Sequence, residues 1–311
     1  MVTKVFIDGE HGTTGLQIQK RLAKRADLEL LSIPHTDKHN INIRQDYLTQ
    51  TDIAILCLPD DVARQTVNWV KNNTKTRIID SSTAHRIAPN WVYGFPEMTA
   101  GQKKRIQEAH YVANPGCYPT GAISLIRPLR EAGLLDAYYP ISINAISGYT
   151  GGGKKLISQM ENQYNQDDLL PNYFMYSLNL KHKHVPEIKV YGQINQTPVF
   201  VPSVGYFPQG MIVSLPLHRH LFTKSANLSD LREIFNNHYS EQNTISIASQ
   251  EETDTLTKLN PECLAHKDGM KLFVFGNEGE NIFNLCAVLD NLGKGAAAAA
   301  VQNLDLMLLN S

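Results

Sequence analysis

The feature that most constrains the fold is a regular alternation of strand-like and helix-like segments in the first third of the chain. Strand-like apolar runs span 4–8, 28–33, 52–59 and 76–82, and segments with helical apolar spacing span 13–25 and 61–73. Strands that alternate with helices of about a dozen residues form right-handed βαβ units. The sequence therefore predicts an α/β domain built on a parallel sheet.

Beyond about residue 115, the pattern changes to closely spaced strand-like runs with few helices between them. These runs span 140–147, 200–207, 210–218, 271–277 and 281–291. Helices are expected over 121–133, 228–240 and 293–310. The pattern is typical of an α+β domain with a mixed, largely antiparallel sheet, and a chain of 311 residues is long enough for two domains.

Charge and hydropathy argue against several classes of partner. The formal net charge is −1, and no run of Lys or Arg suits nucleic acid or an acidic membrane. Charged and glycine residues come too early in the chain for the apolar core of a signal peptide, and the longest uniform stretch, 295–301, is too short to span a bilayer. We expect a soluble cytoplasmic protein that binds a small molecule and neither nucleic acid nor a membrane.

A glycine loop lies between the first strand and the first helix. Gly9, Gly12 and Gly15 let the backbone turn tightly and approach a phosphate, and the helix N-terminus offers free N–H groups. Thr13 and Thr14 add hydroxyl donors. The spacing G-x-x-G-x-x-G is less specific than G-x-G-x-x-G, so a plain glycine turn is the alternative. In its strand–loop–helix context, the loop predicts a Rossmann-type dinucleotide-binding domain.

The end of the second strand bears on the choice of cofactor. An NAD site usually has an acidic residue there to hold the ribose, whereas this chain has Ser32, followed by Lys38 and Arg44. Basic residues in place of the acid favour the 2′-phosphate of NADP(H). Asp37 is an acidic residue nearby that argues against this choice, and Lys38 and Arg44 are also compatible with ordinary solvated charges in a loop. We include Pro59, at the end of the 52–59 strand, among the cofactor-binding candidates.

Cys117 stands where a helix is expected to begin, near Pro119 or Thr120. Proline suits the first turn of a helix, and the positive end of the helix favours a thiolate over a thiol. Backbone N–H groups at that edge can also stabilise an oxyanion. These properties make Cys117 a candidate nucleophile, against the alternative of a small buried apolar residue.

The other cysteines carry no such signal. Cys57 and Cys286 lie in apolar strand-like runs and read as buried thiols, and Cys263 is undecided. The spacing shows no C-x-x-C pair and no disulfide framework, and no set of ligands completes a metal site. An activated cysteine after a nicotinamide-binding domain points to a thioester that exchanges a hydride with the cofactor.

Four further stretches and the opening loop carry a resemblance to a known family. They are NPGCYPTGA (114–122), SGYTGGGK (147–154), KHKHVPEI (181–188), DNLGKGAAAAAVQN (290–303) and VFIDGEHGTTGLQI (5–18). Together they resemble the N-acetyl-γ-glutamyl-phosphate reductases of arginine biosynthesis, in the shorter of two sequence types. The resemblance implies a fold shared with aspartate-semialdehyde and glyceraldehyde-phosphate dehydrogenases.

In that fold the C-terminal helix returns to the nucleotide domain. The resemblance therefore implies an NADP-binding domain of 1–115 plus 292–311 and a catalytic and oligomerisation domain of 116–291, in a homo-oligomer that is a dimer or a tetramer. It implies Cys117 as the nucleophile and His184 as the acid/base. Residues implied to border the cofactor are Ser147, Gly148, Gly151, Gly152, Asn291 and Gly295.

The residues themselves support His184 only in part. His182 and His184 are two apart, and Pro186 disfavours helix at Val185, so an extended backbone would point both rings to one side. Read alone, the pair is equally compatible with a metal site or a surface. The similarly spaced His218 and His220 are expected to be structural or exposed.

An acyl phosphate that also bears a carboxylate needs cationic and N–H donors. Ser82 and Arg86 follow a sheet strand, where open α/β sheets bind ligands, and the family more often has His in place of Asn114. The substrate-binding candidates are Ser82, Arg86, Asn114, Lys154, His182 and Glu187. The implied reaction is NADPH-dependent reductive dephosphorylation of N-acetylglutamyl 5-phosphate. The alternatives are a related aspartate-semialdehyde or lysine-pathway reductase and a non-catalytic NADP-binding regulatory protein.

Overall fold

The computed structural model describes residues 2–72, 75–161 and 171–309. The chain divides into two compact units. Unit 1 comprises Met1–Pro96, Ala100–Gly116 and Ala296–Ser311, and unit 2 comprises Glu97–Thr99 and Cys117–Gly295. The divisions lie one residue and four residues later in the chain than the boundaries expected from the sequence, and unit 2 also includes the short stretch Glu97–Thr99.

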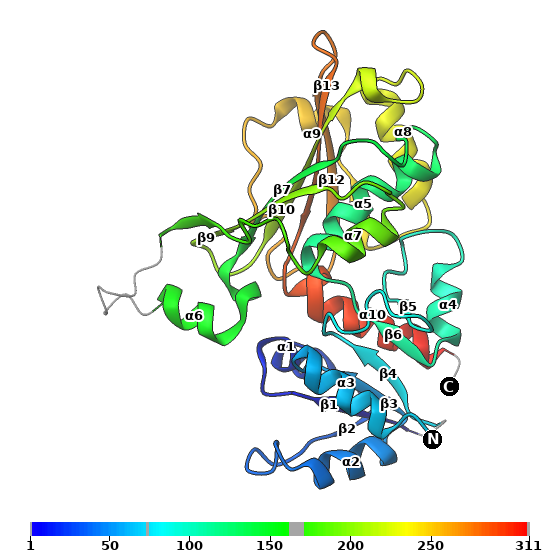
Figure 1. Cartoon of the computed structure of the whole chain (residues 1–311), viewed down its shortest axis with the longest axis vertical. Helices are drawn as coiled ribbons and strands as arrows, with labels where there is room; N and C mark the ends of the chain where they lie inside the picture. The colour runs from blue at the N-terminus through cyan, green and yellow to red at the C-terminus, as the bar shows by residue number, and fades with distance from the viewer. Residues whose placement is uncertain (1, 73–74, 162–170, 310–311) are drawn as a thin grey trace. The chain divides into compact units, whose positions relative to one another are not determined.

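Unit 1 is built on a six-stranded parallel sheet with the order β2-β1-β3-β4-β6-β5 (Figure 1). The strands are β1 (Thr3–Asp8), β2 (Leu28–Leu31), β3 (Ile53–Leu56), β4 (Arg77–Asp80), β5 (Val92–Tyr93) and β6 (Tyr111–Ala113). The helices are α1 (Thr13–Leu22), α2 (Ile41–Gln50), α3 (Asp60–Trp69), α4 (Gln102–Glu108) and α10 (Ala298–Leu308). The strand order reverses at β1, and open α/β sheets bind ligands at the carboxyl ends of the strands beside such a point.

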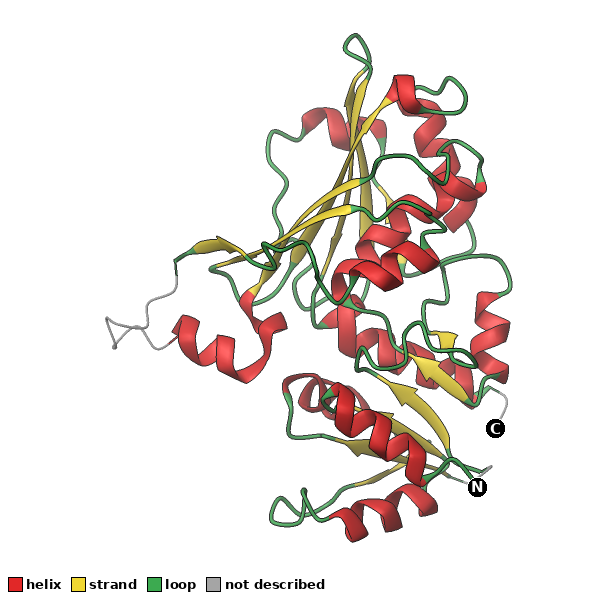
Figure 2. Ribbon diagram, viewed as in Figure 1, coloured by secondary structure: helices red, strands yellow, loops and turns green. Residues whose placement is uncertain are grey.

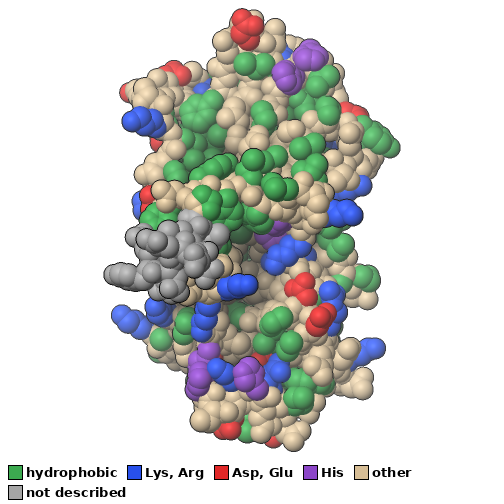
Figure 3. All heavy atoms as spheres, turned by 60° about the vertical axis from the view of Figure 1, so that its left-hand side comes forward, with side chains coloured by type: hydrophobic (Ala, Val, Ile, Leu, Met, Phe, Trp, Pro, Cys, Tyr) green, Lys and Arg blue, Asp and Glu red, His purple; other side chains and the backbone are tan. Residues whose placement is uncertain are grey.

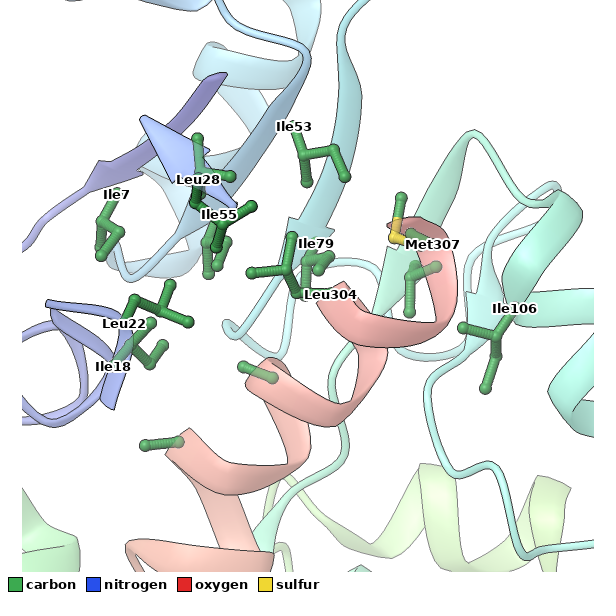
Figure 4. Packing of buried hydrophobic residues seen from close by; sticks show 14 of the residues in the cluster. Ile7, Ile18, Leu22, Leu28, Ile53, Ile55, Ile79, Ile106, Leu304 and Met307 are labelled. Carbon is green, nitrogen blue, oxygen red and sulfur yellow. The ribbon is translucent and has the colours of Figure 1, made fainter. Parts of the chain in front are cut away.

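Helices cover both faces of this sheet. On one face, Ile18 of α1, Ile106 of α4 and Leu304 of α10 share a buried cluster with residues of the strands (Figure 4). On the other face, Leu48 of α2 and Val67 of α3 belong to a second cluster. Although α10 is the last helix of the chain, its apolar side completes the core of the unit that contains the glycine loop.

Unit 2 is built on a seven-stranded mixed sheet with the order β11-β12-β13-β10-β7-β9-β8 (Figure 2). The strands are β7 (Ser142–Gly148), β8 (Tyr173–Met175), β9 (Val199–Gly205), β10 (Met211–His218), β11 (Ile245–Ile247), β12 (Met270–Asn277) and β13 (Ile282–Leu289). The helices are α5 (Cys117–Glu131), α6 (Gly153–Glu161), α7 (Val185–Tyr191), α8 (Leu228–Tyr239) and α9 (Gln250–Thr255). The β7–β9 and β11–β12 pairs are parallel, and the other pairs are antiparallel.

Helix α5 is the central helix of unit 2 and packs against β10, β13, α7 and α8. A Cβ atom at Gly121 would lie 2.7 Å from Val213 Cγ2, so glycine allows the helix to approach the sheet closely. This packing fixes the start of α5, and the first residue of α5 is Cys117.

The predicted fold class is confirmed: a Rossmann-type α/β unit is joined to an α+β unit with a mixed, largely antiparallel sheet. The sequence analysis missed α2, α4, α6 and β8. Helix α2 is as long as α1 and α3, but its buried residues are Arg44 and Leu48 alone, so its apolar spacing is weak. Among the described residues, no helix is long and apolar enough to cross a membrane.

Candidate active site

The glycine loop of unit 1 has a backbone that other residues could not adopt. Gly9 has φ +92°, and a Cβ atom at Gly15 would lie 2.3 Å from the Gly9 carbonyl oxygen. Thr13 and Thr14 begin α1, and the N-cap residue Gly12 provides no side-chain cap for the N–H groups of the first turn. A pyrophosphate fits such an end, because it can approach the backbone closely and accept from these donors. The loop therefore fits the phosphates of a dinucleotide.

The end of β2 forms a polar cluster with the glycine loop. Ser32 Oγ donates to Glu10 Oε1 at 2.7 Å, and the rings of His11 and His35 lie 4.7 Å apart. Lys38 Nζ lies 2.9 Å from His35 Nε2. Ser32 and Lys38 thus lie in a cluster that touches the glycine loop. The sequence analysis did not select the other three members, Glu10, His11 and His35. Their signal in the sequence was their position, in the glycine loop for the first two and just after β2 for His35.

The prediction for Arg44 needs correction. Arg44 lies on α2 and is buried, with Nη2 donating to Asp8 Oδ2 at 2.8 Å and to Thr66 Oγ1 at 2.9 Å. Its guanidinium also lies over the Trp69 ring, at 4.9 Å from the centroid. The sequence reading treated Arg44 as a loop cation because it missed α2. The side chain is part of the interior of unit 1 and is not presented to a cofactor phosphate.

The end of β4 is organised by a buried carboxylate. Asp80 Oδ2 accepts from Ser82 Oγ at 2.7 Å and lies 2.6 Å from His85 Nδ1. Arg86 is buried and donates from Nε to the Asn114 carbonyl at 3.0 Å and from Nη2 to the Ser81 carbonyl at 3.3 Å. Arg86 therefore ties the segment after β4 to the segment that leads to Cys117.

Two other predicted residues of unit 1 follow sheet strands. Pro59 is the N-cap residue of α3, just beyond β3. Asn114 follows β6 and is 1 % exposed, and its amide donates to the Ala296 carbonyl and accepts from Asn303 Nδ2, both at 3.0 Å. This corrects the prediction that Asn114 binds substrate, because its side chain holds the chain together inside unit 1.

In unit 2, Cys117 is partly exposed at the start of α5. Gly295 lies directly against it, since a Cβ atom at Gly295 would be 2.7 Å from Cys117 Cβ. The thiol therefore stands at the positive end of a 15-residue helix. Such a position stabilises a thiolate and supplies N–H donors to a nearby oxyanion.

A cluster of five rings lies beside the start of α5: Tyr118, Tyr176, His182, His184 and Phe200. The His182 and His184 rings are 4.6 Å apart, and the Tyr118 ring is 5.9 Å from that of His184. The His184 backbone N–H donates to His182 Nδ1 at 3.1 Å, which leaves the His182 proton on Nε2, 3.2 Å from Tyr176 Oη. Burial raises the pKa of both Tyr118 and Tyr176, so both hydroxyls remain protonated donors.

The backbone around His184 differs from the extended form expected. Helix α7 begins at Val185, with Pro186 in its first turn, where a proline is tolerated. His184 is buried, and its Nε2 lies 4.0 Å from Oε1 of the buried Glu187. Glu187 thus faces the histidine and can orient it, whereas Lys154 is exposed on α6.

Ser147 and Gly148 are the last two residues of β7, and Gly151 and Gly152 lie in the 3-10 turn Tyr149–Gly152 that follows the strand. A Cβ atom at Gly148 would lie 2.5 Å from the Pro208 carbonyl oxygen, and one at Gly151 would lie 3.1 Å from Asn291 Nδ2. Asn291 accepts from the Gly210 N–H at 2.9 Å and donates to the Gly148 carbonyl at 3.3 Å. Asn291 is buried, and its side chain joins the end of β7 to the segment that contains Gly210.

The described residues contain no group of three or more side chains that could hold a metal ion. The H-x-H pair is accordingly part of the ring cluster and not of a metal site within that part of the chain. Sequence reasoning missed Tyr176, which contacts His182, and the buried pair of Glu97 and Lys294. Nothing in the local sequence of Tyr176 or Glu97 distinguishes either residue, because their contacts form only through the fold.

The four thiols should differ strongly in reactivity. Burial raises the pKa of Cys57 to about 12 and that of Cys286 to about 11, so at pH 8 only about one part in 10³ or less of either is thiolate. We expect iodoacetamide to label Cys117 first and the exposed Cys263 second. Cys57 and Cys286 should be labelled only after the protein unfolds. Peptide mass spectrometry over time checks the order, and early labelling of Cys57 would contradict it.

Comparison with known proteins gives a consistent result. The family model for the semialdehyde dehydrogenase dimerisation domain matches residues 117–291, and that for the NAD binding domain matches residues 29–106. N-acetyl-gamma-glutamyl-phosphate reductases of Brucella anthropi and Brucella suis are 56 % and 57 % identical over 308 residues, 99 % of this chain and of each relative.

Similar solved structures share the fold at low identity. Aspartate semialdehyde dehydrogenase II of Vibrio cholerae, complexed with ASA, has a TM-score of 0.76 at 15 % identity, covering 100 % of this chain and 99 % of that chain. Aspartate semialdehyde dehydrogenase of Candida albicans, with NADP, has a TM-score of 0.67 at 14 % identity, covering 100 % and 99 %. The chain belongs to the semialdehyde dehydrogenase family and, by its closely similar full-length relatives, to the N-acetyl-gamma-glutamyl-phosphate reductases.

Proposed function

We propose that this enzyme reduces N-acetyl-L-glutamyl 5-phosphate with NADPH to N-acetyl-L-glutamate 5-semialdehyde and inorganic phosphate, a step of arginine biosynthesis. The observation that carries the proposal is a partly exposed cysteine at the start of α5, in a unit that also contains a buried histidine facing a carboxylate. The near full-length similarity to reductases of that name supports the choice of substrate.

Unit 1 is the proposed cofactor-binding unit. The glycine loop fits a pyrophosphate, with Gly9, Gly12 and Gly15 admitting it and the first turn of α1 donating to it. Ser32 and Lys38 are the proposed partners of the cofactor's ribose 2′-phosphate. When bound, NADPH supplies the hydride of the reaction.

Cys117 is the proposed nucleophile. Its thiolate attacks the δ-acyl carbon, inorganic phosphate leaves, and a thioester remains on the sulfur. The N–H groups at the start of α5 stabilise the oxyanion that forms in this attack. Gly151 and Gly152, after β7, are proposed to border the cofactor, and Arg86 and Lys154 are the proposed cations for the phosphate and carboxylate of the substrate.

His184 is the proposed acid/base. After hydride transfer to the thioester, it protonates the oxyanion, and it takes the proton back as the thiohemiacetal collapses to aldehyde and thiolate. Glu187 orients its ring, with Oε1 lying 4.0 Å from Nε2, and His182 holds its backbone by accepting from the His184 N–H. Tyr176, bonded to His182, completes this support.

A homo-oligomer and a cytoplasmic location complete the proposal. The matched family model is described as a dimerisation domain. In unit 2, a hollow of about 350 Å³ on β7, β8, β9 and β10 is lined in part by Ile146, Met175, Val201 and Ile212. Figure 3 shows hydrophobic side chains gathered on the surface of unit 2, as expected where a second subunit packs.

The reverse reaction provides the test. We expect phosphate-dependent reduction of NADP+ with N-acetyl-L-glutamate 5-semialdehyde. Its kcat/KM should be roughly 100-fold or more above that with aspartate 4-semialdehyde, because an analogue that lacks a substrate group leaves the polar groups that would bind it without a partner. Absorbance at 340 nm records the rate, with phosphate omitted as the control. A preference for aspartate semialdehyde would assign a different substrate, and NADPH binding without any turnover would indicate a regulatory protein.

A further inference from the structure

Unit 2 contains a buried ion pair that the proposed chemistry does not use. Lys294 and Glu97 are 1 % and 2 % exposed, and Lys294 Nζ donates to Glu97 Oε1 at 2.7 Å. Thr244 Oγ1 donates to the same carboxylate oxygen. Burying two charges costs several kcal/mol per ion, and apolar side chains of the same size often pack as well, so such a pair is better explained by the conformation it specifies.

Lys294 lies in the turn that touches the nucleophile. The turn begins at Asp290, whose Oδ1 accepts from the N–H groups of Leu292 at 2.8 Å and Gly293 at 3.0 Å. The Gly295 N–H then donates to the Asp290 carbonyl at 2.9 Å. The chain is thereby wound into the π-helical turn Gly293–Ala297.

Gly295 is the contact between this turn and Cys117. A Cβ atom on Gly295 would lie 2.7 Å from Cys117 Cβ and 3.2 Å from Cys117 Cα, so the two backbones touch without room for a side chain. Any shift of the turn must therefore move Cys117 or open a gap beside it. Lys294, the preceding residue, fixes the turn to Glu97, which lies far away in the sequence, between β5 and α4.

We propose that the Lys294–Glu97 pair is a positioning device for the catalytic thiol, holding the Gly293–Ala297 turn so that Cys117 stays at the N-terminal end of α5. The pair is neutral overall, so it acts through geometry. The inference rests on the proposed function, in which Cys117 is the nucleophile. A nucleophile displaced by about 1 Å loses roughly 100-fold in rate, which sets the scale of the effect.

The first test removes one charge. In Lys294→Met we expect kcat to fall about 10- to 100-fold while KM for NADPH changes less than about twofold, because the glycine loop belongs to unit 1. Alkylation of Cys117 should become slower, and its rate should rise at a higher pH than in the wild type. A displaced sulfur would lose the stabilisation that the N–H groups of α5 give to the thiolate. Lys271→Met is the matched control, since Lys271 Nζ also pairs with a glutamate, Glu252, at 2.5 Å in unit 2.

The second test separates positioning from simple stability. In the double variant Lys294→Met/Glu97→Gln no charge is left unpaired, so the melting temperature should recover relative to Lys294→Met, whereas kcat and the Cys117 alkylation profile should stay impaired. Recovery of both with the melting temperature would overturn the proposal. If Lys294→Met does not fold, the isosteric variant Glu97→Gln provides the test instead. Unchanged alkylation of Cys117 in that variant would equally refute the proposal that the ion pair positions the thiol.

These readouts keep the two proposals apart. Alkylation of Cys117 needs neither substrate nor cofactor, so it reports on positioning even if the assumed substrate is wrong. If a Cys117→Ser enzyme kept more than about a tenth of wild-type turnover, the covalent mechanism would be excluded, whatever the ion pair does.

Discussion

Cys117→Ser is expected to lower kcat by roughly 10³-fold or more while NADPH binding stays intact. A serine hydroxyl stays protonated at neutral pH, whereas the positive end of a helix favours the thiolate form of a cysteine. Without an ionised nucleophile the acyl phosphate is not attacked and no thioester forms. Because the glycine loop and Cys117 belong to different units of the fold, the substitution leaves the proposed phosphate-binding backbone unchanged.

Three measurements check this expectation. Phosphate-dependent NADP+ reduction gives kcat, NADPH fluorescence gives the cofactor affinity, and mass spectrometry of substrate-treated wild type without cofactor detects an acyl adduct on Cys117. Cys263→Ser is the control, because Cys263 is an exposed cysteine with no assigned role. Retention of more than a tenth of wild-type turnover by the serine enzyme would exclude the covalent mechanism.

Local sequence was sufficient to select the parts of the candidate site that depend on backbone conformation. The glycine loop was recognisable because only glycine tolerates φ +92° at Gly9 and the close approach at Gly15. Cys117 was recognisable because a Pro-Gly pair before it and Pro119 after it mark the start of a helix. These signals are contained in a few neighbouring residues, so they survive without knowledge of the fold.

Residues whose environment depends on distant partners were harder to interpret. Arg44 looked like a loop cation, but α2 carries it inward to Asp8, on a strand 36 residues earlier. Asn114 and Asn291 looked like ligand contacts, yet their amides bond buried backbone groups. A polar residue in a motif can be required for the shape of a site or for contact with a ligand, and the sequence alone does not separate the two roles.

Pro186 illustrates a limit of residue preferences. Proline disfavours helix at the residue before it, which predicted an extended segment through the histidines. In the structure the proline falls in the first turn of α7, where its missing N–H is not needed, and the preceding residue Val185 still begins the helix. The His182 and His184 rings meet through the turn that precedes α7, so their proximity was predicted from the wrong backbone.

His184→Asn is expected to lower kcat about 10²- to 10⁴-fold, the usual contribution of a positioned general acid or base. Asparagine can still donate and accept hydrogen bonds, but it neither gives nor takes a proton near neutral pH. The backbone N–H that bonds His182 Nδ1 is retained, so the ring cluster should stay assembled and KM should change little. His218→Asn is the matched control, because His218 is an exposed histidine at the end of β10.

The pH dependence of kcat distinguishes a proton donor from a residue that only fills space. In the reductive direction a required proton donor makes the rate fall at high pH, and this high-pH limb should be absent from the His184→Asn profile. Cys117 should still be alkylated in the variant, because the start of α5 is unchanged. A variant that kept the wild-type limb at reduced kcat would assign the acid/base to another group, and Tyr176, bonded to His182 Nε2, would then be the first residue to substitute.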